Sequence, residues 1–172
     1  MIVDAQIIAQ PLSGEFEERI YDHENPWNSA KWGYIKFTES SGKEWLGQFR
    51  GESRNVKISP QLQCILVLSS DYLFKLNIHN GELEELLEHP SYRKLEVAPS
   101  GEFILADYYQ IEKMTSNLKD IEIIESPIQM DFIEFLQWSD LQLEFSCKAL
   151  LNGEKEHLLI LDTVKWKIEL KN

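Results

Sequence analysis

The 172-residue sequence predicts an all-β protein made of small antiparallel, blade-like sheets. The first observation is a recurring unit, in which a strand, a turn and an apolar strand return after about 39 residues. The second is that short apolar or alternating runs are separated by Gly, Pro, Asn and Ser, which favour turns. The third is that only residues 82–89 show the spacing of even a short helix.

The sequence of residues 1–51 predicts a polar N-terminal region followed by a β-hairpin. Residues 1–31 are expected to be a lead-in and a long surface loop, because residues 13–31 keep no hydrophobic period. A short apolar run before Pro11 also fits an edge strand. Residues 32–51 alternate apolar and polar side chains on both sides of a Ser-Ser-Gly turn, which is typical of a hairpin.

Residues 53–90 form the first blade-like unit. Val56-Lys57-Ile58-Ser59-Pro60 leads into the apolar run Cys64-Ile65-Leu66-Val67-Leu68, as expected for a buried central strand. The Asn80-Gly81 pair fits a tight hairpin turn, since both residues tolerate positive φ. Residues 82–89 fit either a fourth strand or a short helix with its leucines on one side, and the preceding turn favours the strand.

Two further units, residues 92–126 and 131–172, repeat this order less faithfully. The second has an inner strand expected over residues 103–109, and in the third Asn152-Gly153 predicts a hairpin turn. A closed propeller needs at least four blades. The chain, read as one domain, is therefore expected to be a small or incomplete β-propeller-like fold with a degenerate N-terminal blade, or a stacked β-sandwich.

Charge narrows the class of partner. Seventeen Lys and Arg against 29 Asp and Glu leave a formal charge of −12. Such a chain repels phosphate backbones, so nucleic acid is not expected as a direct partner. A basic protein would be attracted and would associate faster. The alternative interpretation is that acidity only maintains solubility.

Targeting and redox signals favour a cytoplasmic protein. The N-terminus has no basic segment, which argues against a secretory signal, and no apolar run approaches the ~20 residues that span a membrane. Membrane binding is therefore not expected. Cys64 and Cys147 lie in apolar runs and are expected to be small core residues, which suits a reducing compartment.

No catalytic motif is present, so we expect a protein that is not an enzyme and that holds no metal or cofactor. The sequence lacks the nucleophile elbow, the Walker loop and the dinucleotide-binding glycines. None of its four histidines has a His or Cys at metal-ligand spacing. His23, between Asp22 and Glu24, is the best candidate for an imidazole in an alternative interpretation, a small carboxylate/His hydrolase. A solvated loop histidine is the simpler interpretation.

Acidic residues beside aromatic residues are the remaining signal. Aromatic side chains anchor protein interfaces, and carboxylates pair with arginine. Trp27 lies on the expected loop and is predicted to reach an interface, whereas Trp32, Trp45 and Trp166 lie on strands and fit a core. The predicted partner-binding residues are Glu15, Glu17, Glu18, Asp22, Glu24, Trp27, Glu82, Glu84, Glu85, Glu88, Asp107, Tyr108 and Tyr109.

The run Trp45-Leu46-Gly47-Gln48-Phe49-Arg50-Gly51, followed by Ile58-Ser59-Pro60 and Ile65-Leu66-Val67-Leu68, resembles bacterial immunity proteins of polymorphic toxin and contact-dependent growth inhibition systems. The resemblance implies a cognate toxin domain, often a basic nuclease, that is bound and blocked in the cytoplasm. Immunity families share no binding motif, so the resemblance assigns no binding residue. The repeating units also suit a general β-propeller-like interaction scaffold, which is the alternative function. The oligomeric state stays open.

Overall fold

The computed structural model describes residues 1–149 and 156–171, and within them every regular element is a β-strand. Sixteen strands form four four-stranded sheets, and none of these closes into a barrel in the described part of the chain. The predicted all-β class with small blade-like sheets is confirmed. Contacts divide the chain into two compact units, unit 1 (Met1–Pro90) and unit 2 (Ser91–Asn172).

The first sheet of unit 1 has the strand order β1-β3-β4-β2. Its strands are β1 (Ile2–Ile8), β2 (Glu17–Tyr21), β3 (Trp32–Glu39) and β4 (Glu44–Arg50). The antiparallel strands β3 and β4 form the predicted hairpin. The N-terminal apolar run is an edge strand, because β1 pairs antiparallel with β3 and places Ile8 opposite Tyr34.

The segment over residues 13–31, expected to be a loop, contains the strand β2. This strand pairs in parallel with β4, with Glu17 opposite Trp45. Its side chains do not alternate cleanly, since Tyr21 is buried while Ile20 is 66% exposed and the rest are polar. A parallel partner also needs no tight turn, so neither of the local signals of a strand was present.

The second sheet of unit 1 follows chain order. Its strands are β5 (Ser53–Ser59), β6 (Cys64–Ser69), β7 (Tyr72–Asn77) and β8 (Leu83–Glu88). The segment that could have been a helix is the strand β8, which pairs with β7 and places Glu88 opposite Tyr72. The prediction of a strand rather than a short helix, which was based on the Asn80-Gly81 turn, is confirmed.

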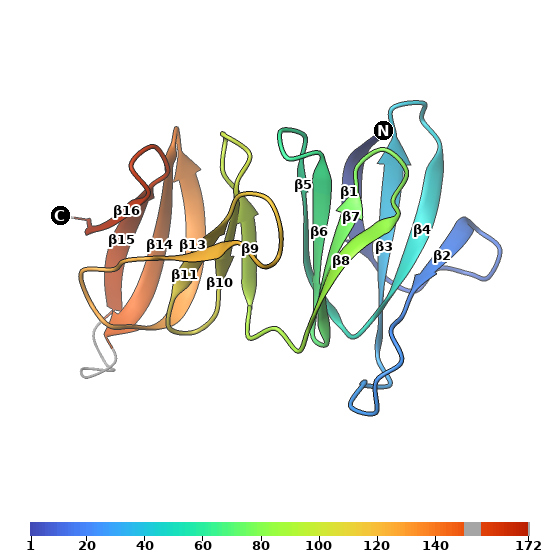
Figure 1. The fold of residues 1–172 in the computed structure, drawn as a ribbon, viewed down its shortest axis with the longest axis horizontal. Coiled ribbons are helices and arrows are strands. Elements are labelled where there is room, and N and C mark those ends of the chain that lie inside the picture. Colours follow the sequence, from blue (N-terminus) through green and yellow to red (C-terminus); the bar gives the residue numbers. More distant parts are fainter. Residues whose placement is uncertain (150–155, 172) are drawn as a thin grey trace. The chain divides into compact units, whose positions relative to one another are not determined.

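The two sheets of unit 1 can be followed in Figure 1. One core joins them, and half of its buried side chains are aromatic. The ring of Phe49 stacks on Tyr21 with centroids 4.4 Å apart and meets Phe74 edge-on at 5.1 Å. The ring of Phe37 stacks on Trp45, also at 4.4 Å. Such ring pairs contribute beyond their buried area, so aromatic contacts are a large part of what stabilises this unit.

Gly47 of β4 makes this close ring packing possible. A Cβ atom at that position would lie 2.5 Å from a ring atom of Phe49 and 2.9 Å from one of Phe37. Both distances are shorter than carbon atoms tolerate. Only glycine therefore fits between these rings without moving them.

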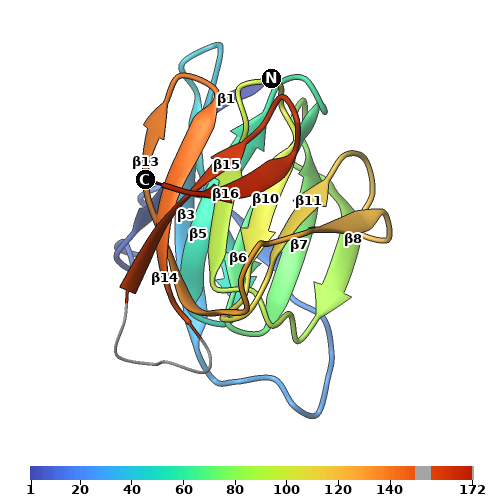
Figure 2. The same ribbon diagram turned by 90° about the vertical axis from the view of Figure 1, so that its left-hand side faces the viewer.

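Unit 2 is built from two further antiparallel sheets, whose strands can be followed in Figure 2. The first holds β9 (Lys94–Val97), β10 (Phe103–Ala106), β11 (Ile111–Met114) and β12 (Ile121–Ile124), and the second holds β13 (Met130–Ser139), β14 (Gln142–Ala149), β15 (Glu156–Asp162) and β16 (Lys167–Leu170). The core cluster that the two sheets share is mostly aliphatic and contains one fully buried ring among the described residues, Phe145, while Phe103 of β10 is buried outside this cluster. Cys64 in unit 1 and Cys147 in unit 2 are both buried, as predicted, and burial raises the pKa of the Cys64 thiol to about 11.

The inner strand of unit 2 is shorter than predicted. It was expected to extend to Tyr109, but β10 ends at Ala106. The carboxylate of Asp107 accepts hydrogen bonds from the backbone N–H groups of Tyr109 at 2.7 Å and Gln110 at 2.9 Å. This side-chain turn replaces the strand ladder. The predicted Asn152-Gly153 turn lies outside the described residues.

Candidate protein-binding surface

The Trp27 loop (residues 22–31) presents a single indole at its tip. The backbone N–H of Asn28 donates to the carbonyl of Asn25 at 3.1 Å, and that of Trp27 donates to the Asn25 side-chain oxygen at 3.0 Å. Asn at the first position and Pro26 at the second are the residues such a turn favours. Trp27 is 81% exposed, the highest value for any large hydrophobic side chain of the described residues.

The start of the loop is tied to β4 through Arg50. Its guanidinium donates to both carboxylate oxygens of Asp22, at 2.8 and 2.6 Å, and lies 3.9 Å from the ring centroid of Trp32. A two-point pair of this kind fixes orientation as well as distance. The hydrogen bonds from Arg50 hold the pKa of the Asp22 carboxyl below its usual range.

The end of the loop is tied to the turn between β6 and β7 through Asp71. This carboxylate accepts from the backbone N–H of Ser29 at 2.7 Å and from the Ser70 hydroxyl at 2.6 Å. Burial alone would raise the pKa of Asp71, but these hydrogen bonds outweigh it, so the pKa is lowered. Both ends of the loop thus depend on ionised carboxylates.

The middle of the loop is held by His23 and Asn28. The amide of Asn28 donates to the His23 carbonyl at 2.6 Å, and the hydroxyl of Tyr72 bonds the Asn28 side chain. The Nε2 atom of His23 lies 3.3 Å from Glu88, which also accepts from the Asn25 amide at 2.6 Å. His23, predicted either as an imidazole catalyst or as a solvated residue, is therefore a half-exposed part of the loop's support.

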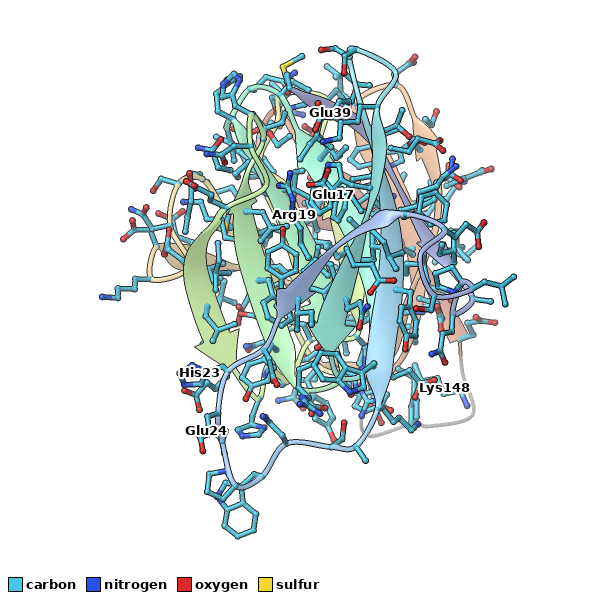
Figure 3. All side chains as sticks on the ribbon, turned by 90° about the vertical axis from the view of Figure 1, so that its right-hand side faces the viewer. Glu17, Arg19, His23, Glu24, Glu39 and Lys148 are labelled. Atoms are coloured by element: carbon cyan, nitrogen blue, oxygen red, sulfur yellow. The ribbon has the colours of Figure 1, made fainter. Side chains whose placement is uncertain are left out.

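The structure brings together two acidic segments that the sequence could not connect. The hydroxyl of Tyr21 in β2 donates to the carbonyl of Gly81 at 2.6 Å, and Arg19 of β2 donates to the carbonyl of Asn80. The segment 15–24 and the segment 82–88 therefore lie on the same side of unit 1. Figure 3 shows this side, with Glu17 and Arg19 on β2 and with His23 and Glu24 on the loop.

Some of the predicted acidic residues are already neutralised by a nearby cation. Glu17 pairs with Lys43 at 2.7 Å, and Glu85 pairs with the mostly buried Lys75 at 2.6 Å. Glu84 lies 3.7 Å from the same lysine, and Asp22 is held by Arg50. The predicted acids of unit 1 that form no ion pair with a described Lys or Arg are Glu15, Glu18, Glu24, Glu82 and Glu88.

A small polar hollow of about 170 Å³ lies beside this acidic side. It is lined by Gln10, Pro11, Ser13, Glu18, Tyr34, Leu46 and Gln48. The Glu18 carboxylate accepts one hydrogen bond from the Gln48 amide at 2.6 Å, which leaves it further acceptor capacity. The free acceptor capacity of this carboxylate suits a group that only donates, such as an ammonium or guanidinium.

The three predicted residues of unit 2 belong to a different environment. Asp107 serves its own turn, as described above. Tyr108 is 37% and Tyr109 58% exposed, and the Tyr108 ring meets the ring of Phe132 at 5.4 Å. Arg93 lies over the same Tyr108 ring at 4.7 Å. Phe132 and Arg93 were not among the predicted residues, because nothing in the spacing of these residues connects them to Tyr108.

No family model matches the sequence, and a search of curated proteins found no significant match. Residues 1–149 and 156–171 contain no helix that could cross a bilayer. In the same residues, no three His, Cys, Asp or Glu side chains gather closely enough to hold a metal ion.

Proposed function

We propose that this chain is an immunity-type protein, which neutralises a basic, nuclease-type toxin domain in the cytoplasm by binding it through unit 1. The observation that carries the proposal is Trp27, an indole 81% exposed at the tip of a loop tied down at both ends. An exposed tryptophan on an ordered support is the type of residue that anchors protein interfaces. Long ordered loops are also often functional.

Charge supports a basic partner for this surface. The carboxylates of Glu18, Glu24 and Glu82 have no described cationic partner, so their field is available to Lys and Arg of another protein. The hollow beside Glu18 would receive one such head group. An acidic surface of this kind speeds association with a basic protein and excludes acidic ones, while the indole provides the desolvated contact.

The first experiment tests the partner. The product of the neighbouring upstream gene should co-purify with this chain, and co-expression should restore growth that the toxin domain blocks. If that gene encodes no toxin domain and the chain protects against none, the proposal is wrong.

The second experiment tests the surface. Trp27→Ala should weaken toxin binding by about 2 kcal/mol or more, which is about 30-fold, because truncating a central interface tryptophan commonly costs this much. Val164→Ala, in unit 2 and 68% exposed, is the matched control and should change affinity less than twofold. Isothermal titration calorimetry measures both, and circular dichroism checks the fold.

A third experiment tests the charges. Glu18→Gln combined with Glu24→Gln should slow association at low salt and flatten its salt dependence, because unpaired carboxylates contribute the steering field. The control is Glu44→Gln, whose carboxylate is paired with Lys36 at 2.9 Å. Stopped-flow fluorescence at 0.05 and 0.5 M salt separates this rate effect from the contact made by Trp27. Association that is equally fast in all variants would contradict the role of charge.

A general interaction scaffold is the second candidate, and one observation favours it. Unit 2 carries an exposed aromatic cluster with cations above its rings. This cluster suits an acidic partner, unlike the acidic side of unit 1. A pull-down that yields several partners of weak salt dependence would support the scaffold over the immunity role. The hydrolase interpretation predicts that His23→Ala abolishes turnover, and unchanged turnover would remove it.

A further inference from the structure

Phe132 combines an unfavourable backbone conformation with an exposed ring. It lies in β13, where the pairing with β14 shifts register between Asp131 and Glu134. Its φ is 52°, in the left-handed region that bulky L-residues avoid. Its side chain is nevertheless 54% exposed. Backbone outliers of this kind concentrate at functional sites, and bulges often re-aim a side chain toward one.

Phe132 is part of a cluster of exposed rings. Its ring meets Tyr108 edge-on with centroids 5.4 Å apart, and Tyr108 meets Tyr109 at 6.2 Å. Tyr108 and Tyr109 come from the turn after β10, whereas Phe132 comes from β13, so two different sheets of unit 2 contribute. Contiguous exposed rings from separate elements mark interaction surfaces more often than single exposed residues do.

Two cations lie over rings of this cluster. The guanidinium carbon of Arg93 is 4.7 Å from the Tyr108 ring centroid, and the Nζ of Lys148 is 5.4 Å from that of Phe132. Neither cation forms an ion pair with a described Asp or Glu.

The acids nearest in the chain are engaged with other groups. Asp107 accepts from the backbone of its own turn, and Asp131 accepts from the Phe132 N–H at 2.9 Å. Glu134 pairs with Lys94. By contrast, each lysine of the groove of about 410 Å³ around Trp166 already has an acid: Lys113 pairs with Glu122, Lys165 with Asp162 and Lys167 with Glu169.

We propose that Arg93, Tyr108, Phe132 and Lys148 form a second docking surface, which binds an acidic polypeptide segment. Carboxylates of that segment would pair with Arg93 and Lys148, and an apolar side chain between them would cover the rings. The cations already occupy one face of the Tyr108 and Phe132 rings, which favours carboxylate pairing over the stacking of nucleic acid bases. The surface is in unit 2 and selects the opposite charge, so it goes beyond the toxin-binding role proposed for unit 1.

The test uses the full chain and a fluorescein-labelled 12-residue peptide with eight Glu and a central Leu-Leu pair. Binding should be detectable by fluorescence anisotropy at 0.05 M salt and weaken at 0.3 M. Arg93→Ala combined with Lys148→Ala should weaken it at least tenfold, and Phe132→Ala about fivefold. Lys119→Ala combined with Lys165→Ala removes the same charge elsewhere in unit 2 and should change binding less than twofold.

Several outcomes would overturn this proposal. The proposal is wrong if the peptide does not bind, or if a peptide with Gln in place of Glu binds equally well. It is also wrong if the Arg93/Lys148 and Lys119/Lys165 double variants weaken binding equally. Tighter binding of an oligo-dT strand or of phosphatidylserine vesicles through the same residues would assign the surface to phosphates instead. Phe132→Gly suits the left-handed φ and keeps the test meaningful if Phe132→Ala misfolds. Trp27→Ala should leave peptide binding unchanged, so this proposal and the toxin-binding proposal can fail separately.

Discussion

Units 1 and 2 are both built from two four-stranded sheets, yet they place their aromatic rings differently. In unit 1 the aromatic rings stack inside the core, and Trp27 is the only aromatic side chain of its described residues that is largely exposed. In unit 2 the described core is mostly aliphatic, while Tyr108, Tyr109 and Phe132 are exposed. An exposed ring must be prevented from collapsing onto the protein. Unit 1 does this with a hydrogen-bonded loop, and unit 2 with a bulged strand and cations over the rings.

The largest expected effect tests whether stacked rings stabilise unit 1 more than aliphatic packing stabilises unit 2. Phe49→Ala should lower the free energy of unfolding by about 4–5 kcal/mol, since Phe49 contacts three other rings. Phe145→Ala should cost about 3 kcal/mol, because Phe145 has one ring neighbour, at 6.5 Å. Urea unfolding followed by circular dichroism gives both values. Equal losses would show that the ring contacts contribute nothing beyond burial.

The next effect tests how tightly the rings of unit 1 are packed. Gly47→Ala should cost about 1–3 kcal/mol, because its Cβ would overlap the rings of Phe49 and Phe37. Adding Phe49→Leu should recover part of this loss by making room for the methyl group. If the double variant is instead as unstable as the sum of both changes, the overlap is not the cause.

A smaller effect tests how strongly the Asp22–Arg50 pair holds the Trp27 loop on unit 1. Asp22→Asn should cost about 1 kcal/mol, because it removes a two-point ion pair whose carboxylate side chain is 36% exposed. Glu52→Gln breaks the exposed pair with Lys31 and should cost less than about 0.5 kcal/mol. Thermal unfolding gives the stabilities. Fluorine NMR of 5-fluorotryptophan-labelled protein should show a change at Trp27 in the first variant and none in the second.

The same loop should respond to acid. The pKa values of Asp22 and Asp71 are lowered in the folded protein, so the stabilisation they provide is present above their unfolded pKa of about 3.9. It is lost as pH falls through the lower folded values. The Trp27 fluorine signal should therefore be constant from about pH 5 to 8 and change below about pH 4. A change centred well above pH 5 would show that these two carboxylates do not control the loop.

The smallest effect tests the strain in unit 2. Phe132→Gly should change the free energy of unfolding by less than about 1 kcal/mol, because relief of the positive φ offsets the lost ring contacts. Gln137→Gly, at an exposed position of the same strand, has no strain to relieve and should cost about 0.5–1 kcal/mol. Chemical denaturation compares the two. A loss several times larger for Phe132→Gly would mean that its ring stabilises the fold rather than serving a surface.

Prediction from sequence succeeded where the signals were local. The turns at Asn80-Gly81 and Ser41-Gly42 follow from residues next to one another, so the hairpins around them could be located in advance. The strand β2 was missed because its partner is distant in sequence and parallel. The tie between Asp22 and Arg50 and the contact between Tyr108 and Phe132 also join distant segments. Such pairs become visible only once the sheets are formed.

Local sequence signals also predicted only part of the candidate binding surface on unit 1. The exposure of Trp27 could be predicted from Pro26 and the irregular sequence around it. The acidic character of its side of unit 1 could also be predicted, but the joining of segments 15–24 and 82–88 could not. Neutralisation of Glu17 and Glu85 by lysines depends on register between strands, which composition does not contain.

The pairing of β1 with β3 has a consequence for how specificity could change. Ile8 lies opposite Tyr34, and the chain between them leaves the sheet twice, once on each side of β2. Lengthening such an excursion adds little closure entropy, about 0.6 kcal/mol for each doubling. New sequences could therefore be exchanged in the two segments that flank β2, residues 9–16 and 22–31, provided that β2 itself keeps its pairing with β4. A single sheet would then serve as a common frame for a series of recognition loops, each matched to a different target.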